Sequence, residues 1–366
     1  KGFELDSDVP DLIPEAVPDD EIWYITSNGS TLTLNKAKDW GGYPETDFGA
    51  EVISNTYTDG KGIIKFDAPV TKIGEYAFLY NTELKEMYLP DSVNSIGEEA
   101  FCGCEELESL YLPDDLEKVG TMAFWGCLKL TEFNTALASQ DKRCLIIDSK
   151  IVGFAQYQID EYTTPDNVES IADCAFANTR SLKKITVSEG VKSIGSEAFI
   201  ANGGVPSLEE VYLPSTLESL GVYAFVSQKN IKAFYGNNPF VSDDNMCLTV
   251  QNYNGLGYNT LVAFASGSDV TEYTIPDGVQ AIENYGCCYA TNLTKLNFPD
   301  SFEAVFSGHA FEGTTNVETI TGKYVIEDGR SMVKDGKLIF VAGGGLESYT
   351  PPEGVTPPEG VTPPAS

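Results

Sequence analysis

A solenoid of stacked coils is the fold class that this sequence predicts, and three observations support the prediction. The stretch from Leu84 to Leu130 contains one phrase twice, with each position of the second copy 23 residues after its counterpart. Each copy begins with L-x-x-[LM]-x-L and a proline, which indicates a short strand. Each continues with I-G-x-x-A-F, which recurs along the chain. This period is typical of a leucine-rich-repeat solenoid, in which neighbouring coils cover each other's apolar faces.

Length and charge limit the class of protein. The 366 residues carry 23 basic and 55 acidic side chains, which give a net charge of −32. This charge repels nucleic acid and anionic membranes and favours cationic partners, although it also serves simply to keep a long solenoid soluble. No apolar run is long enough to span a bilayer. Because the chain starts at Lys1 without a signal segment, we expect a trimmed chain whose targeting segment has been removed.

The first 66 residues precede the repeats. Residues 1–21 are acidic, rich in proline and without periodicity, which predicts a flexible tether. Asn28-Gly29 and Asp59-Gly60 suit the tight turns of two β-hairpins, the first of which would pair the strand before it with residues 31–34. A solenoid needs a cover on its first coil, so we predict that residues 22–66 form an N-terminal β cap.

The repeats are predicted to occupy residues 67–350. Most copies of I-G-x-x-A-F begin 23 to 26 residues apart, but 52 residues separate Val119 from Ile171 and 62 separate Leu220 from Ile282. Short apolar runs around a turn fill both long intervals and recur near the end, which predicts hairpin insertions near 140–160, 245–266 and 324–342. Residues 351–366 form a proline-rich tail. The strand starts indicate about 11 coils and are Leu84, Leu107, Leu130, Tyr162, Leu182, Leu208, Ile231, Tyr273, Leu293, Val317 and Tyr349.

Each residue of the repeated phrase has an expected structural role. Together these roles predict a β-rich α/β solenoid. The leucines point inward along one parallel strand per coil, and the proline ends the strand. Gly97 and its equivalents allow a tight turn before a short helical turn, in which Ala lets the backbone approach closely and Phe fills the core. Cys104 and Cys127 share one slot in successive coils, which predicts a buried ladder of small apolar side chains, although a disulfide between them is conceivable.

The phrase from Leu89 to Leu107 resembles the BspA-like leucine-rich repeats of surface-exposed and secreted proteins of anaerobic bacteria. The stretch from Gly62 to Phe78 is similar to the first coil of such proteins, and the resemblance covers about residues 48–350. It implies a cell-surface location, often through a lipidated N-terminal cysteine, and adhesion to host matrix proteins or coaggregation. The anchoring cysteine is not in this chain, so lipidation would belong to a removed precursor. The family implies no catalytic residues.

A column of tyrosines is the candidate binding site. One outward strand position of each coil precedes the last apolar residue of L-x-x-L-x-L, and half of these positions are tyrosine. Tyrosine offers an apolar ring and a polar tip, which suits recognition of protein or sugar, although it is also simply a good sheet residue. The column consists of Tyr88, Tyr111, Asn134, Thr186, Tyr212, Tyr235, Asn297 and Thr321.

Other chemistry finds little support in the sequence. Acidic pairs are too common for one to be assigned as the acid and base of a glycosidase. Residues 242–245 (Ser-Asp-Asp-Asn) could bind calcium weakly, and His309 is expected on the surface of a coil. A single histidine and the lack of a C-x-x-C pair argue against a structural zinc site. We therefore expect no metal and no cofactor.

Three functions are compatible with these features of the sequence. The first is a non-enzymatic, monomeric surface protein that presents its sheet, and also its hairpins, to a protein ligand. The second is a glycan-binding module of a nutrient-uptake system, which would use the same tyrosines. The third, an enzyme, ranks far below. The sequence does not identify the ligand, because solenoids host many.

Overall fold

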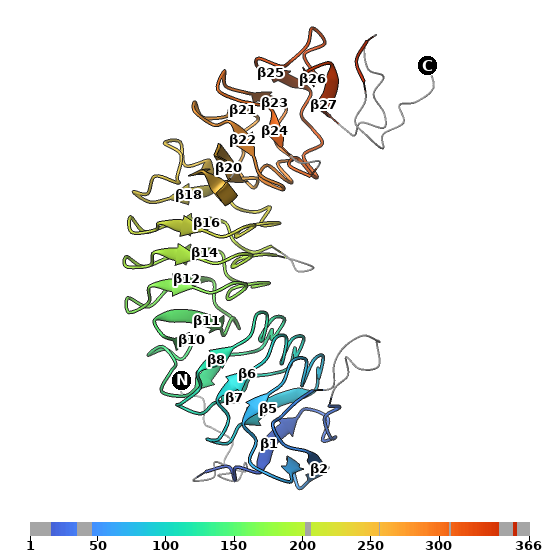
Figure 1. Cartoon of the computed structure of the whole chain (residues 1–366), viewed down its shortest axis with the longest axis vertical. Helices are drawn as coiled ribbons and strands as arrows, with labels where there is room; N and C mark the ends of the chain where they lie inside the picture. Colours follow the sequence, from blue (N-terminus) through green and yellow to red (C-terminus); the bar gives the residue numbers. More distant parts are fainter. Residues whose placement is uncertain are drawn as a thin grey trace, which may run out of the picture. The chain divides into compact units, whose positions relative to one another are not determined.

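The computed structural model describes residues 16–34, 46–201, 206–255, 257–306, 309–343 and 354–356. The chain divides into two compact units, Lys1–Tyr157 and Gln158–Ser366, and each is a stack of coils (Figure 1). Most of the expected tether, the coil start at Tyr349 and most of the tail lie outside the described residues.

Unit 1 contains a six-stranded sheet, a small parallel sheet and a hairpin. The six-stranded sheet has the order β2-β3-β1-β5-β7-β9. Its strands are β1 (Glu21–Thr26), β2 (Val52–Thr58), β3 (Lys61–Phe66), β5 (Leu84–Tyr88), β7 (Ser109–Tyr111) and β9 (Glu132–Asn134). The small sheet consists of β4 (Lys72–Ile73), β6 (Ser95–Ile96) and β8 (Lys118–Val119), and the hairpin of β10 (Cys144–Ile147) and β11 (Lys150–Phe154).

Unit 2 repeats the same parts. One parallel sheet contains β12 (Glu161–Thr163), β14 (Lys184–Thr186), β16 (Glu210–Tyr212) and β18 (Ala233–Tyr235), and another contains β21 (Glu272–Thr274), β23 (Lys295–Asn297) and β25 (Thr319–Thr321). The I-G strands are β13 (Ser170–Ile171), β15 (Ser193–Ile194), β17 (Ser219–Leu220), β22 (Ala281–Ile282) and β24 (Val305–Phe306). The hairpins are β19 (Cys247–Gln251) with β20 (Asn259–Phe264), and β26 (Ser331–Lys334) with β27 (Lys337–Val341).

This arrangement is the predicted leucine-rich-repeat solenoid, a parallel-strand β-solenoid of about 11 turns. The coil strands pair in parallel with equivalent residues side by side, for example Met87 with Leu110 and Leu110 with Phe133. These inward side chains are fully buried. Antiparallel hairpins occupy the three positions at which insertions were predicted.

The N-terminal segment differs from the expectation at its first hairpin. β1 pairs antiparallel with β3 on one side and with β5 on the other, so both edges of β1 are occupied. Residues 31–34 therefore have no edge to join and form no strand. Amide side chains bind them instead: Asn55 Nδ2 donates to the Leu32 carbonyl at 2.9 Å, and Asn81 Nδ2 donates to the Thr33 carbonyl at 2.9 Å. β2 and β3 pair across Asp59-Gly60 as the sequence suggests.

The expected helical turns are not helices. Within the described residues, the only helical segment is the 3₁₀ turn η2 (Tyr253–Gly255). The I-G-x-x-A-F phrase forms consecutive turns, and the residue before Ala-Phe has a positive φ, such as 50° at Glu99 and 55° at Glu197. A left-handed residue interrupts helical hydrogen bonding, so each turn ends before a helix can form.

Gly97 is needed for the contact between coils rather than for an unusual backbone angle. A Cβ atom at Gly97 would lie 2.5 Å from the Glu75 nitrogen, and one at Gly120 would lie 2.4 Å from the Glu98 nitrogen. The glycine column thus lets successive backbones touch. The sequence suggested a tight turn at this position, but here it is the neighbouring coil that requires glycine.

Phenylalanine ladders form the core of both units, and both ladders end in the same way. In unit 1, Phe78, Phe101 and Phe124 stack with centroids 5.3 and 5.9 Å apart, and Phe133 then meets Phe124 edge-on at 64°. In unit 2, Phe176, Phe199 and Phe225 stack at 5.1 Å, and Phe234 meets Phe225 at 69°. Each edge-on ring belongs to the strand that precedes a hairpin, so the hairpin-bearing coil closes the ladder.

The cysteine slot is buried as predicted, but its residues act as hydrogen-bond donors. All eight cysteines are free thiols, so Cys104 and Cys127 form no disulfide. Other coils place Gln or Thr in the same slot, and each donor reaches the carbonyl of the residue at the Phe position one coil earlier. The pairs are Cys104 Sγ to Phe78 (3.1 Å), Cys127 Sγ to Phe101 (3.2 Å), Gln228 Nε2 to Phe199 (2.7 Å) and Thr314 Oγ1 to Cys287 (2.6 Å).

Residues 354–356 of the tail begin like a further coil. Gly354 and Gly278 have φ values of 85° and 87°, and both belong to a Pro-acid-Gly-Val sequence. The Thr356 amide donates to the Gly336 carbonyl at 2.9 Å, just as Gln280 donates to Asn259 at 2.8 Å after the previous hairpin. Thr356 therefore forms an isolated parallel bridge with Lys337 of β27, where a next coil would pair.

Candidate functional site

The predicted column lies on the outward face of the coil strands in both units. In unit 1, Tyr88 pairs with Tyr111, and Tyr111 pairs with Asn134. In unit 2, the register aligns the remaining members of the column in two sheets: Thr186, Tyr212 and Tyr235, and separately Asn297 with Thr321. The parallel register thus brings the four predicted tyrosines together as two pairs, one in each unit.

The unit 1 pair is tightly stacked. The ring centroids of Tyr88 and Tyr111 are 4.2 Å apart and the planes differ by 11°. The Tyr88 hydroxyl donates to Glu86 Oε2 at 2.5 Å. Burial and this carboxylate raise the pKa of Tyr88 well above its ordinary value, and burial followed by Glu86 raises the pKa of Tyr111. Tyr88 is only 9% exposed, so Tyr111 is the more accessible ring.

The cap adds a tryptophan next to this pair. Trp23 in β1 lies opposite Tyr88 in the antiparallel register, on the same outward face. Its Nε1 donates to Glu21 Oε2 at 2.7 Å, and Lys61 Nζ lies 2.8 Å from the ring centroid. Unit 1 therefore presents a row of three aromatic residues, Trp23, Tyr88 and Tyr111, in which a lysine already covers the tryptophan.

The unit 2 pair has the same stacking but different neighbours. The centroids of Tyr212 and Tyr235 are 4.6 Å apart and the planes differ by 19°. The Tyr212 hydroxyl donates to Glu210 Oε2 at 3.1 Å, and burial together with this hydrogen bond raises the pKa of Tyr212. Lys184 Nζ lies 5.1 Å from the Tyr212 ring centroid, a cation–π contact supplied by the preceding coil.

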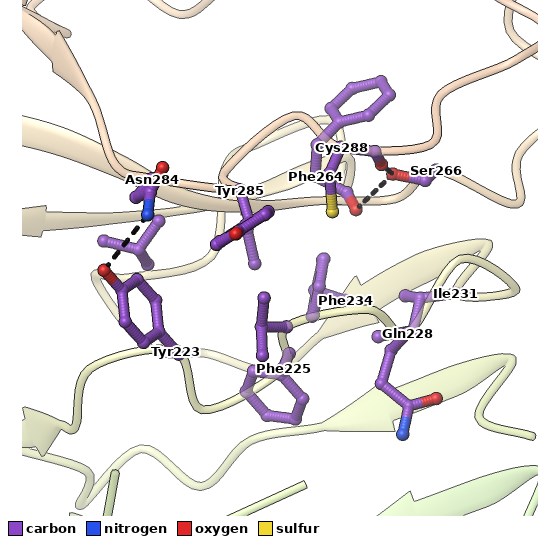
Figure 2. A pocket seen from close by; sticks show the side chains of 13 residues that line it. Tyr223, Phe225, Gln228, Ile231, Phe234, Phe264, Ser266, Asn284, Tyr285 and Cys288 are labelled. Atoms are coloured by element: carbon purple, nitrogen blue, oxygen red, sulfur yellow. Dashed lines mark hydrogen bonds between the residues drawn. The ribbon is translucent and has the colours of Figure 1, made fainter. Parts of the chain in front are cut away.

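Two hollows of the surface lie outside the tyrosine column and differ greatly in volume. A cleft in unit 2 between Tyr223, Phe225, Asn284 and Tyr285 has a volume of about 10 Å³, room for one water (Figure 2). Asn284 Nδ2 donates a hydrogen bond to the Tyr223 hydroxyl at 3.3 Å, which joins two residues that line the cleft (Figure 2). A groove of about 510 Å³ crosses β4, β6 and β8, with glycine backbone and both lysine and glutamate side chains around it.

The other candidates from the sequence have structural roles. Asp244 accepts from Ser242 Oγ at 2.6 Å and from the Met246 amide at 3.0 Å, so it fixes the turn before a hairpin. Asp141 has the same role before the first hairpin. His309 is exposed, lies 3.0 Å from Glu312 and stacks on Tyr285. No group of three metal-binding side chains occurs among the described residues.

Comparison with family models identifies the repeat. The model of the BspA type leucine-rich repeat region matches residues 57–144, 147–249 and 258–331 in 6 copies, which is more than half of the chain. The chain belongs to the BspA-type leucine-rich repeat family. The resemblance inferred from the sequence is thereby confirmed. A search of curated proteins found no match.

A search of solved structures found proteins similar to this BspA-type chain. A leucine-rich cell surface protein from Faecalibacterium prausnitzii has a TM-score of 0.51 at 23% identity, over 74% of this chain and 68% of that one. The pneumococcal vaccine antigen PcpA has a TM-score of 0.42 at 18% identity, over 71% and 56%. A leucine-rich repeat protein from Eubacterium ventriosum has a TM-score of 0.42 at 14% identity, over 72% and 85%.

Sequence reasoning about this BspA-type chain missed two features of the site. Trp23 joins the tyrosines only because β1 runs antiparallel to β5, and its distance of 65 positions from Tyr88 follows no repeat. Glu86 and Glu210, two positions before Tyr88 and Tyr212, were also overlooked, although alternation along a strand places them on the same face. In the described part of the chain, no helix is long and apolar enough to cross a membrane.

Proposed function

We propose that this chain is a non-enzymatic cell-surface protein that binds a protein partner through the outward face of its coil strands, as in adhesion. The observation that carries the proposal is the pair of stacked tyrosines in each unit. Stacking fixes the rings before a partner arrives, so binding costs little further side-chain entropy. Tyrosine is also enriched among the residues that dominate protein interfaces.

Membership of a family with cell-surface relatives supports the proposed location. The proposed absence of catalysis rests on the site itself. On the outward face, the hydroxyls of Tyr88 and Tyr212 donate to glutamates and a lysine lies over the Tyr212 ring, contacts that suit binding rather than bond-breaking chemistry. The proposed location and the proposed absence of catalysis both go further than the repeat fold itself.

The alternative, a glycan-binding module of a nutrient-uptake system, is less well supported by the geometry. Sugars stack on an open aromatic face, but each ring of a stacked pair covers one face of its partner. Lys184 lies over Tyr212 as well. The rings therefore offer mainly edges and hydroxyls, which suit hydrogen bonding to a polypeptide.

A double variant, Tyr111→Ala with Tyr212→Ala, tests the proposal. Binding to a panel of purified matrix proteins and to host cells should fall at least about tenfold, given the weight of buried tyrosines in interfaces. Tyr80→Ala is the matched control, because Tyr80 is 45% exposed and lies outside the column. Unchanged binding by a folded double variant would end the proposal. Binding to a glycan array alone would favour the alternative.

A further inference from the structure

Next to the tyrosine column runs a second row of outward residues, two positions earlier on each strand. In unit 2 this row alternates in charge, because the parallel register places Lys184 between Glu161 and Glu210. Lys184 Nζ lies 3.7 Å from Glu161 Oε2 and also contacts the Tyr212 ring. The next sheet has a similar pair, with Lys295 Nζ 2.7 Å from Glu272, although Thr319 follows on the other side of Lys295.

The same row in unit 1 has no cation at its centre. The register places Ser109 between Glu86 and Glu132. Neighbouring strands lie about 4.8 Å apart, so the two glutamates are about 10 Å apart across a short side chain. Ser109 Oγ lies 3.5 Å from Glu132 Oε1 and does not extend above the sheet as a lysine would.

The charges around Ser109 are only partly neutralised. Glu86 accepts the Tyr88 hydroxyl but forms no ion pair with any described residue. Glu132 forms one ion pair, with Lys142 Nζ 3.4 Å from its carboxylate. Lys85 Nζ instead lies 3.5 Å from the carboxylate of Glu108. The neighbouring Tyr111 hydroxyl experiences both carboxylates, which add to burial in raising its pKa. The position above Ser109 is thus a negative site beside an accessible aromatic ring.

We propose that this position, between Glu86 and Glu132 and beside Tyr111, receives a lysine or arginine side chain of the protein partner. The partner cation would take the place that Lys184 holds in unit 2. Charge complementarity favours this occupant, since the chain carries a net charge of −32 and a cation here would meet a carboxylate without an ion-pair partner. The inference rests on the proposed function and specifies the chemistry of its partner.

Three variants that each change the net charge by +1 test the inference. Ser109→Lys fills the position and Glu86→Gln removes its unpaired carboxylate, whereas Glu161→Gln removes a carboxylate from the equivalent row in unit 2, where Lys184 is already present. The probe is a fluorescent peptide of four Arg-Gly repeats at low ionic strength, measured by anisotropy. We expect Ser109→Lys and Glu86→Gln to weaken binding about threefold, as for one exposed ion pair, and Glu161→Gln to leave it nearly unchanged.

Equal weakening by all three variants would overturn the inference, because the peptide would then respond only to the net charge of the chain. An absence of peptide binding to the parent chain would also overturn it. Thermal melts of each variant exclude unfolding as the cause. This inference and the proposed function can fail independently. If partner binding depends on Tyr111 and Tyr212 but is unchanged by Ser109→Lys, the proposed function stands and only this inference is overturned.

Discussion

The two tyrosine pairs are built by the same phrase, yet their surroundings differ. Tyr88 and Tyr111 stack at 4.2 Å, and Tyr212 and Tyr235 at 4.6 Å, with a glutamate accepting the first hydroxyl of each pair. In unit 1 the strand before the pair is β1 of the cap, which brings Trp23. In unit 2 it is another coil, which brings Lys184.

This difference separates what the repeat determines from what its neighbours determine. Parallel register alone places the rings one strand spacing apart, so stacking occurs wherever successive coils carry tyrosine. The charge and the access of each pair come from the strand alongside, which the phrase does not specify. The same scaffold thereby presents one pair already in contact with a lysine and one beside Glu86, which has no ion-pair partner among the described residues.

The largest expected effect concerns the core that both pairs share. Phe101→Ala and Phe199→Ala each remove the middle ring of a ladder, which should cost about 3–5 kcal/mol. Hydrogen exchange should show the loss of protection mainly in the unit that carries the substitution. An unchanged melting transition for Phe101→Ala would show that the ladder does not hold the coils.

Alkaline pH should destabilise unit 1 through the buried hydroxyl of Tyr88. The folded pKa of Tyr88 is raised above the unfolded value of about 10, so its contribution is complete below pH 10 and is lost as the pH rises further. The loss is at most about 1.4 kcal/mol per pH unit for one tyrosine. Denaturant melts between pH 9 and 11.5 should be less pH-dependent for Tyr88→Phe than for the parent chain. Equal slopes would contradict the burial of this hydroxyl.

A smaller effect is expected from the charged row. Lys184→Ser gives unit 2 the Glu-Ser-Glu row of unit 1 and should destabilise the chain by about 0.5 kcal/mol or less, because the pair is exposed. The change should disappear in 1 M salt, where the charges are screened. A loss that persists in salt would mean that Lys184 acts through packing on Tyr212 instead.

The smallest effect should be local to the end of unit 2. Thr356→Pro removes the amide that donates to the Gly336 carbonyl, so the tail should pair less well with β27. Hydrogen exchange at the Leu338 amide, which donates to the Thr356 carbonyl at 2.9 Å, should become faster without a change in melting temperature. Unchanged protection would show that the tail is not held by this contact.

The fold could be predicted because its signals are local and repeat. The inward leucines, the Ala-Phe phrase and the hairpin insertions all lie where the period places them. The turns that carry Ala and Phe were expected to be helical, but the residue before them is left-handed. No pattern of residue types identifies such a position.

The site could be predicted only in part. The tyrosine column follows from alternation along each strand, so its residues were found. Trp23 was not found, because antiparallel pairing of the cap has no period. The hydrogen-bonding role of Cys104 was also missed, although the occurrence of Gln228 and Thr314 in the same slot was a visible signal.

Site-specific photo-crosslinking tests the central claim most directly. Replacing Tyr111 with p-benzoylphenylalanine places a reactive aromatic group on the outward face, and the same replacement at Tyr80 is the control outside the column. Irradiation with a panel of purified matrix proteins should give a crosslinked product from position 111 that an excess of unmodified chain suppresses. Crosslinking from position 80 alone, or equally from both, would contradict binding through the tyrosine face.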